Sequence, residues 1–243
     1  MSLVRAVTTR ALDAAFPAIC PGCGREGTPI CQECRPALDA RLDQPPGVSI
    51  GMPFDLPAGL LQLEWCAPFA GVVRHSLHAL KYKGERRLAG PLGSAVARRW
   101  ARAGAGGDLV VHVPVHATRA RRRGFDQARL IAEVAARDLG LPHGSILERH
   151  RETIAQFDLD RRQRSTNVRG AFRLVGTSRA LRDRPGAPAG SREAAGHPPI
   201  LAGRWILLVD DVMTTGATLS ACATVLLDAG AMGVSAITVA RER

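Results

Sequence analysis

The sequence predicts an α/β protein in which helices flank a parallel β-sheet, with a small cysteine-rich segment near the N-terminus. Two observations predict this architecture. From residue 60 to the C-terminus, short apolar runs alternate with amphipathic segments, which is typical of parallel strands joined by helices. Ahead of these runs, four of the 6 cysteines form two Cys-x-x-Cys pairs within residues 20–34.

Composition and charge argue against a membrane protein and a secreted protein. The 243 residues include 33 Lys and Arg against 22 Asp and Glu, which gives a formal charge of +11. No stretch approaches the ~20 consecutive apolar residues of a membrane span, and the N-terminus lacks the apolar core of a signal peptide. We therefore expect a cytoplasmic protein without membrane insertion.

The basic excess favours an anionic partner. A positive field attracts either a phosphate-rich small molecule or a nucleic acid. Aromatic residues make up only 4% of the chain, and no run of Lys and Arg is interleaved with them, as a base-stacking surface requires. Direct nucleic-acid recognition is therefore not expected as the main activity.

The chain divides into three parts. Apolar residues at helical spacing predict a helix over residues 2–16, which Pro17 ends. The cysteine pairs follow, and residues 41–59 are rich in Pro and Gly, which indicates a linker. The predicted parts are an N-terminal helix with a cysteine knuckle (1–40), this linker (41–59), and the main domain (60–243).

Within the main domain we expect strands and helices in alternation. Strands are predicted at 60–69, 108–113, 145–147, 171–175, 205–209 and 234–239. Helices are predicted at 71–80, 88–103, 124–139 and 217–227. Residues 176–203 have few apolar residues and many Pro, Gly, Ser and Arg, so we expect a mobile surface insertion there.

The two cysteine pairs have the spacing of a metal site. Each Cys-x-x-Cys turn can place two thiolates on one ion, and two such turns complete a tetrahedral zinc site with no open position. Two disulfides are the alternative, which the lack of a secretion signal argues against. A redox Cys-x-x-Cys usually occurs once, beside a strand–helix unit. We therefore predict structural Zn²⁺ bound by Cys20, Cys23, Cys31 and Cys34.

The most informative motif follows the predicted strand at 205–209. This strand delivers two adjacent carboxylates, Asp210 and Asp211, to the sheet edge where parallel strands bind ligands. A turn of small residues and a helix N-terminus follow, and their N–H groups and hydroxyls suit a phosphate. The carboxylates suit sugar hydroxyls or a divalent cation. The pattern predicts a site for a phosphorylated ribose, with its phosphate on Thr214, Thr215, Gly216, Ala217 and Thr218.

These residues resemble the fingerprint with which type I phosphoribosyltransferases bind phosphoribosyl pyrophosphate (PRPP). More narrowly, the chain is similar along nearly its whole length to the ComF family of bacterial competence-related proteins. The similarity is carried by both cysteine pairs, Leu80-Lys81-Tyr82, Val113-Pro114-Val115-His116, Arg119, Arg123-Gly124-Phe125-Asp126-Gln127, Arg151, Thr153, Gln156, Asn167, Gly170-Ala171-Phe172 and the turn that begins at Asp210.

Two positions depart from the pattern of that family. Residues 176–203 are longer than the usual connector, and Asp126 stands where the family usually has Asn. A carboxylate beside a polyanion site would repel the ligand unless an arginine neutralises it, so the function of Asp126 is open at this point.

The resemblance implies a type I phosphoribosyltransferase-like fold, with residues 60–103 as its hood, and a function for each part of the motif. Asp210 and Asp211 would meet the ribose hydroxyls, and the turn at 214–218 the 5-phosphate. Mg²⁺ would bridge oxygens of the ribose and the pyrophosphate. The pyrophosphate would lie on Pro114, Val115, His116, Arg119 and Lys81. Residues 149–164 stand where this fold carries a mobile active-site loop, here with Arg149, Arg151, Thr153 and Gln156.

We expect the protein to be an enzyme that transfers the phosphoribosyl group of PRPP to an acceptor, in a process related to competence and DNA uptake. Catalysis would be electrostatic, with Arg151, Asp210 and Asp211 as the catalytic residues. One alternative is a non-catalytic adaptor that senses PRPP or a nucleotide, with the uptake machinery or single-stranded DNA as its partner. A zinc-dependent nucleic-acid-binding module is the second alternative. Neither the acceptor nor the oligomeric state follows from the sequence.

Overall fold

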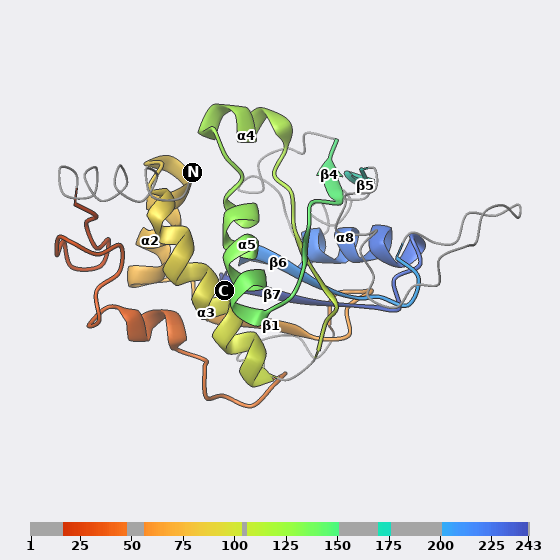
Figure 1. Ribbon diagram of the computed structural model, residues 1–243, viewed down its shortest axis with the longest axis horizontal. Coiled ribbons are helices and arrows are strands. Elements are labelled where there is room, and N and C mark those ends of the chain that lie inside the picture. The colour runs from red at the N-terminus through yellow and green to blue at the C-terminus, as the bar shows by residue number, and fades with distance from the viewer. Residues whose placement is uncertain (1–16, 48–55, 104–105, 151–169, 176–200, 243) are drawn as a thin grey trace, which may run out of the picture.

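A five-stranded parallel sheet lies at the centre of the computed structural model, which describes residues 17–47, 56–103, 106–150, 170–175 and 201–242 (Figure 1). Its strands, in spatial order, are β1 (Leu63–Pro68), β7 (Gly233–Arg241), β6 (Trp205–Met213), β2 (Leu109–His112) and β3 (His143–Gly144). Every neighbouring pair in this sheet is parallel. The predicted α/β architecture is therefore confirmed.

The neighbouring strands β6 and β7 are buried over most of their length. β6 is buried from Ile206 to Val209, and β7 is buried at every residue except its last. Strands that are covered on both faces have no solvent-facing side, so their sequence is a continuous apolar run. β2 pairs with β6 so that His112 lies opposite Val209. The carboxyl ends of β2 and β6 therefore lie side by side.

Helices cover both faces of the sheet (Figure 1). The four longest within the described ranges are α2 (Gly71–Tyr82), α3 (Ala89–Ala103), α5 (Gln127–Leu139) and α8 (Ala217–Asp228). The first three pack with Leu207 on one face, and α8 packs with Leu208 on the other. α3 and α5 approach closely at Gly93, where an added Cβ would lie 2.6 Å from the carbonyl oxygen of Ile131. A larger residue there would force these two helices apart.

A second, antiparallel sheet pairs β4 (Leu147–Arg149) with β5 (Phe172–Leu174). Phe172 packs into the same apolar cluster as α8. The strand predicted at 171–175 therefore exists but lies outside the parallel sheet. The bounds of the strand predicted at 145–147 are wrong, because β3 ends before this segment and β4 begins at its last residue.

The segment at 17–47 packs against α2 and α3. A short 3₁₀ helix, η1 (Arg35–Asp39), brings Leu38 into the core that these helices share. The guanidinium of Arg99 on α3 is buried, and it donates to the carbonyl of Gln44 at 2.6 Å and to Glu64 on β1 at 2.6 Å. Buried charges require such partners. This network ties the start of the linker to the edge of the sheet.

The other described elements have the predicted type, with shifted bounds. β6 continues to Met213, past the predicted end at residue 209. The sequence analysis did not predict α4 (Ala117–Arg123), which follows β2. The predicted helix at 2–16, most of the insertion at 176–203 and the middle of the linker lie outside the described residues. None of the helices in the described ranges has the length and apolarity that a membrane crossing requires.

Candidate functional site

The acid pair, Asp210 and Asp211, lies near the carboxyl end of β6. The strand runs through both residues, and Asp210 stands opposite Thr238 of β7. The hydrogen-bonded ladder of the sheet, rather than a loop, therefore holds their backbone. Ligands of open α/β sheets bind at this edge.

Side chains from two helices contact the Asp211 carboxylate. The residue Asp211 is only 5% exposed. Its Oδ2 atom lies 2.8 Å from Nζ of Lys81 on α2 and accepts a hydrogen bond of 2.9 Å from Nε2 of Gln127 on α5. Gln127 accepts in turn from Nη1 of Arg123 at 2.8 Å. No described residue donates to the second oxygen, Oδ1, so this atom is the one available to a ligand.

Asp210 differs from its neighbour in its environment. Its Oδ1 atom accepts the backbone N–H of Asp211 at 2.8 Å. Burial raises the pKa of the Asp210 carboxyl well above its ordinary value, and the charge of Asp211 acts in the same direction. Within the described chain, Asp210 has no cation at ion-pair distance. Asp210 therefore holds a proton more readily than an ordinary aspartate.

The turn that follows β6 leads into α8. Gly216 caps this helix with a positive φ of 77°, and a Cβ there would lie 2.5 Å from Pro57. Glycine is therefore required both by the left-handed backbone and by the close contact. Thr215 Oγ1 accepts from the N–H of Ala217 at 3.4 Å. Among the described residues, none accepts a hydrogen bond from the backbone N–H groups of Thr214, Thr215, Gly216 and Thr218.

A second loop lies beside the acid pair, after β2. It contains Pro114, Val115 and His116, and Nδ1 of His116 accepts the N–H of Thr118 at the start of α4. Arg119 is half-buried on α4, and it makes no ion pair with a described residue. The structure thus brings these residues to the sheet edge that carries Asp210 and Asp211, because β2 and β6 are neighbours.

Asp126 joins this loop to α5. Its Oδ2 atom accepts the N–H of Val115 at 2.9 Å, and its Oδ1 atom accepts the N–H of Arg129 at 3.1 Å as the N-cap of α5. Both oxygens are acceptors, which the carboxylate of Asp supplies and the amide of Asn does not. Asp126 therefore replaces the usual Asn of the family in a position that has two backbone donors and no arginine partner among the described residues.

The segment from Arg123 to Gln127 runs from the end of α4 to the start of α5 and also contacts Arg86. Arg123 closes α4, Phe125 lies under the guanidinium of Arg86 at 4.7 Å, and Gln127 opens α5. The sequence analysis included this segment in the resemblance but assigned no function to Gln127. Its contact with Asp211 spans two distant segments, so no local pattern predicts it.

Lys81, which the resemblance assigns to the pyrophosphate, pairs with Asp211 in the structure. Arg149 lies on β4 with its guanidinium 5.5 Å from the ring of Phe172. The other residues assigned to the mobile loop, Arg151, Thr153 and Gln156, lie outside the described residues.

Four cysteine thiols form a cluster that can hold a metal ion. The Sγ atoms of Cys20, Cys23, Cys31 and Cys34 all lie within 4.8 Å of one another. Two of them, from Cys23 and Cys31, are 3.5 Å apart. Tetrahedral zinc with Zn–S bonds of about 2.3 Å separates sulfurs by about 3.8 Å, so the donor set fits this ion. With four sulfur ligands the ion would be structural.

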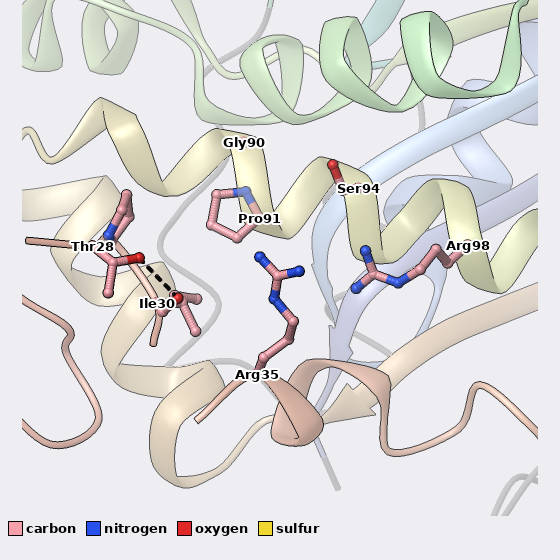
Figure 2. Close-up of a pocket in the computed structure, with 8 residues that line it drawn as sticks. Thr28, Ile30, Arg35, Gly90, Pro91, Ser94 and Arg98 are labelled. Carbon is pink, nitrogen blue, oxygen red and sulfur yellow. Dashed lines mark hydrogen bonds between the residues drawn. The ribbon is translucent and has the colours of Figure 1, made fainter. Parts of the chain in front are cut away.

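A pocket of about 290 Å³ lies between the cysteine knuckle and α3 (Figure 2). Arg35 and Arg98 extend their guanidinium groups into it. Arg98 donates three hydrogen bonds to Asp39, of 2.7, 3.0 and 3.3 Å, and Ser94 in the wall donates to Asp138. These carboxylates balance the local charge. None of the predicted site residues lines this pocket, so we do not place the functional site there.

Basic and aromatic side chains meet where α2 ends near α4. Tyr82 is 59% exposed, its ring lies 4.7 Å from that of His78, and the guanidinium of Arg123 lies 5.2 Å from it. Arg86 covers Phe125 close by. The sequence analysis missed this cluster, because its members belong to two segments that only the fold brings together.

Together these features define a class: an α/β protein whose central parallel strand carries an acid pair and leads into a turn of small residues, with a four-cysteine cluster near the N-terminus. No family model matches the sequence. The DNA utilization protein YhgH of Salmonella typhi is 30% identical over 222 residues, covering 84% of this chain and 87% of the relative. The protein of the same name from Escherichia coli (strain K12) is 28% identical over 223 residues, covering 89% and 86%.

Competence protein F of Haemophilus influenzae is 30% identical over 114 residues, or 46% of this chain and 41% of the relative. The chain belongs to the ComF family, as the sequence motifs indicate. Among solved structures, the allosteric regulatory enzyme of purine biosynthesis is 18% identical with a TM-score of 0.38. That similarity covers 63% of this chain, which spans 26% of the other one.

Proposed function

We propose that the acid pair and the turn at 214–218 bind PRPP, or a related phosphorylated ribose, and that the protein transfers the phosphoribosyl group to an acceptor. One observation carries this proposal. Four backbone N–H groups of the turn have no acceptor among the described residues, and they lie directly after two carboxylates at the ligand-binding edge of the sheet. Backbone N–H groups are seldom left without a partner unless water or a ligand accepts from them.

The turn suits the 5-phosphate. Its N–H groups lie at the N-terminus of α8, where the helix dipole favours negative charge. The hydroxyls of Thr214 and Thr218 make no hydrogen bond with described residues and add two further donors. Because Gly216 lies against Pro57, the turn has a fixed shape.

The acid pair suits the ribose hydroxyls and Mg²⁺. Asp211 Oδ1 and Asp210 Oδ2 accept no hydrogen bond from described residues, so each can accept from a hydroxyl. The donor set also fits Mg²⁺, which prefers oxygen ligands and commonly combines one or two carboxylates with substrate phosphates. When bound, the ion neutralises charge on the pyrophosphate. In the ligand-free chain, Lys81 supplies the positive charge next to Asp211.

The loop after β2 and helix α4 suit the pyrophosphate. Arg119, Arg121 and Arg122 form no ion pair with any described residue, so their charge is available to a leaving group. Fixed positive charge of this kind stabilises departing pyrophosphate, while the acid pair orients the sugar for attack at its anomeric carbon. Arg151, with Asp210 and Asp211, completes the proposed catalytic set. The four cysteines would bind structural Zn²⁺.

The test is the release of pyrophosphate from PRPP and Mg²⁺ in the presence of a panel of nucleobases. We expect release that depends on one acceptor and is lost in Asp210→Asn. Binding of PRPP without release for any acceptor would instead identify the non-catalytic adaptor, with the same site used for sensing.

The cluster of Tyr82, His78 and Arg123 favours a second function, the binding of single-stranded DNA. Aromatic rings beside guanidinium groups stack on bases and contact phosphates. Relatives named as DNA utilization and competence proteins support a partner of this kind. We expect a fluorescent oligonucleotide to bind with an affinity that falls as salt rises, and Tyr82→Ala to weaken binding about tenfold. Binding that is absent or independent of salt would exclude this function.

A further inference from the structure

Gln127 lies between the arginine-rich helix α4 and the acid pair and contacts both. Arg123 only donates hydrogen bonds, so the amide oxygen of Gln127 must face it, and the amide NH₂ then faces Asp211. We propose that Gln127 is a positioning residue that fixes the Asp211 carboxylate for its ligand, and that Arg123 acts on Asp211 through it. This inference deepens the proposed function and takes its ligand from it.

The contact between Gln127 and Asp211 is shielded from water. Gln127 is 4% exposed and the Asp211 side chain 7%, so water cannot readily replace either partner. Polar groups in such surroundings bind strongly when they are fully paired and are costly when they are not. A Gln127 amide turned by 180° would direct its oxygen at Asp211, and Arg123 prevents this turn.

The contacts of Arg123 also support this proposal. Gln127 is its only hydrogen-bond acceptor among the described residues, and its buried Nε–H has no acceptor there. The guanidinium carbon lies over the Tyr82 ring, 5.2 Å from its centre. Arg123 is therefore held by one amide and one ring, and its orientation is coupled to that of Gln127.

The ion pair with Lys81 alone does not fix the orientation of the Asp211 carboxylate plane. The ammonium of Lys81 is a point charge on a flexible stem, whereas the amide of Gln127 approaches from a helix with a defined direction. Both donors bind Oδ2, which leaves Oδ1 directed at the site. Loss of Gln127 removes the only hydrogen bond that described residues make to this carboxylate besides the ion pair.

The experiment measures Asp211 directly in the ligand-free protein. The ¹³C resonance of the Asp211 carboxyl, assigned through Asp211→Asn, is recorded at neutral pH in Gln127→Met and Arg123→Met. Arg122→Met is the matched control, because Arg122 lies on the same helix, is exposed and contacts no described side chain. Gln127→Glu is a second variant that keeps the acceptor for Arg123 but places a like charge against Asp211.

We expect the resonance to move in Gln127→Met and, in the same direction, in Arg123→Met, and to stay in place in Arg122→Met. In the double variant Gln127→Met/Arg123→Met, it should move no further than in Gln127→Met alone, since both act through one contact. An unchanged resonance in Arg123→Met, or additive shifts in the double variant, would overturn the proposal. Gln127→Glu should move the resonance without losing the fold.

Calorimetry with PRPP and Mg²⁺ separates this inference from the proposed function. We expect Gln127→Met to weaken binding about tenfold, the size of effect typical of one hydrogen bond to a charged group. If the unaltered protein does not bind PRPP while the carboxyl shifts follow the expected pattern, the proposed function fails and the positioning stands. If Gln127→Met binds PRPP with the same affinity as the unaltered protein, Gln127 is not a positioning residue, and the proposed PRPP site is retained.

Discussion

Nζ of Lys81 lies 2.8 Å from Oδ2 of Asp211, so a cation at the end of α2 neutralises a carboxylate on the central strand. Both side chains are largely removed from water, at 19% and 7% exposure. The neighbouring Lys83 is exposed and has no acidic partner among the described residues.

Replacing Lys81 by Met should lower the free energy of unfolding by about 2 kcal/mol, because the buried Asp211 side chain loses its cationic partner. The measurement is urea denaturation at neutral pH. Lys83→Met is the matched control and should change stability by less than about 0.5 kcal/mol, as exposed charges usually do. Equal effects of the two substitutions would mean that the pair does not stabilise the fold.

Asp126→Asn should cost about 1 kcal/mol of stability. The amide can accept from Val115 or from Arg129, but its NH₂ group then faces the other backbone N–H. Because the substitution also removes a negative charge from the acid-pair site, PRPP should bind more tightly to the variant than to the unaltered protein. Denaturation and calorimetry measure the two effects, and a stabilised variant would contradict the described pairing.

The stability of the protein should fall in acid through a pair of histidines. Nδ1 of His112 lies 3.1 Å from Nε2 of His143, and burial lowers the pKa of His112 from 6.5 to about 3, with the charges of His143 and Arg129 acting in the same direction. The folded state keeps His112 neutral where the unfolded chain takes up a proton. The His112 contribution is therefore complete above pH 6.5 and decreases by about 1.4 kcal/mol per pH unit toward pH 3.

Unfolding curves recorded across that range test this sign. In His112→Gln, the slope of the free energy of unfolding against pH should decrease between pH 6 and pH 4 by the equivalent of about one proton. His75 is exposed, and His75→Gln should leave this slope unchanged. A slope that persists in His112→Gln would assign the acid sensitivity to other groups.

The cysteine cluster should contain about one equivalent of zinc per chain. Elemental analysis of Cys31→Ser should find the metal lost, and chelation should lower the melting temperature, because the knuckle packs on the core through Leu38. Cys222→Ala is the matched control and should retain the metal, since Cys222 is a buried residue of α8 and is not part of the cluster. Metal content unaffected by Cys31→Ser would contradict the site.

Local patterns account for the parts of the site that sequence analysis could predict. Asp210, Asp211 and the turn follow one apolar strand, and the four cysteines have ligand spacing, so each group is visible in a short stretch of residues. Strand type and helix type follow from apolar periodicity in the same way.

Contacts between distant segments account for the parts that sequence analysis missed. Nothing near Lys81 indicates that its partner is Asp211, and nothing near Gln127 indicates a bond to the same atom. β5 is too short for its apolar pattern to specify which sheet it joins, and its pairing with β4 depends on packing under α8. The predicted strand ended too early because Asp210 and Asp211 interrupt the apolar run of β6, although its ladder with β7 continues to Met213.

Isothermal titration of the zinc-loaded protein with PRPP in the presence of Mg²⁺ tests the central claim most directly. The account predicts binding at one site, weakened about tenfold or more in Asp211→Asn and in Thr214→Val, and unchanged in Lys83→Met. Absence of binding, or equal affinity in Asp211→Asn and the unaltered protein, would contradict it.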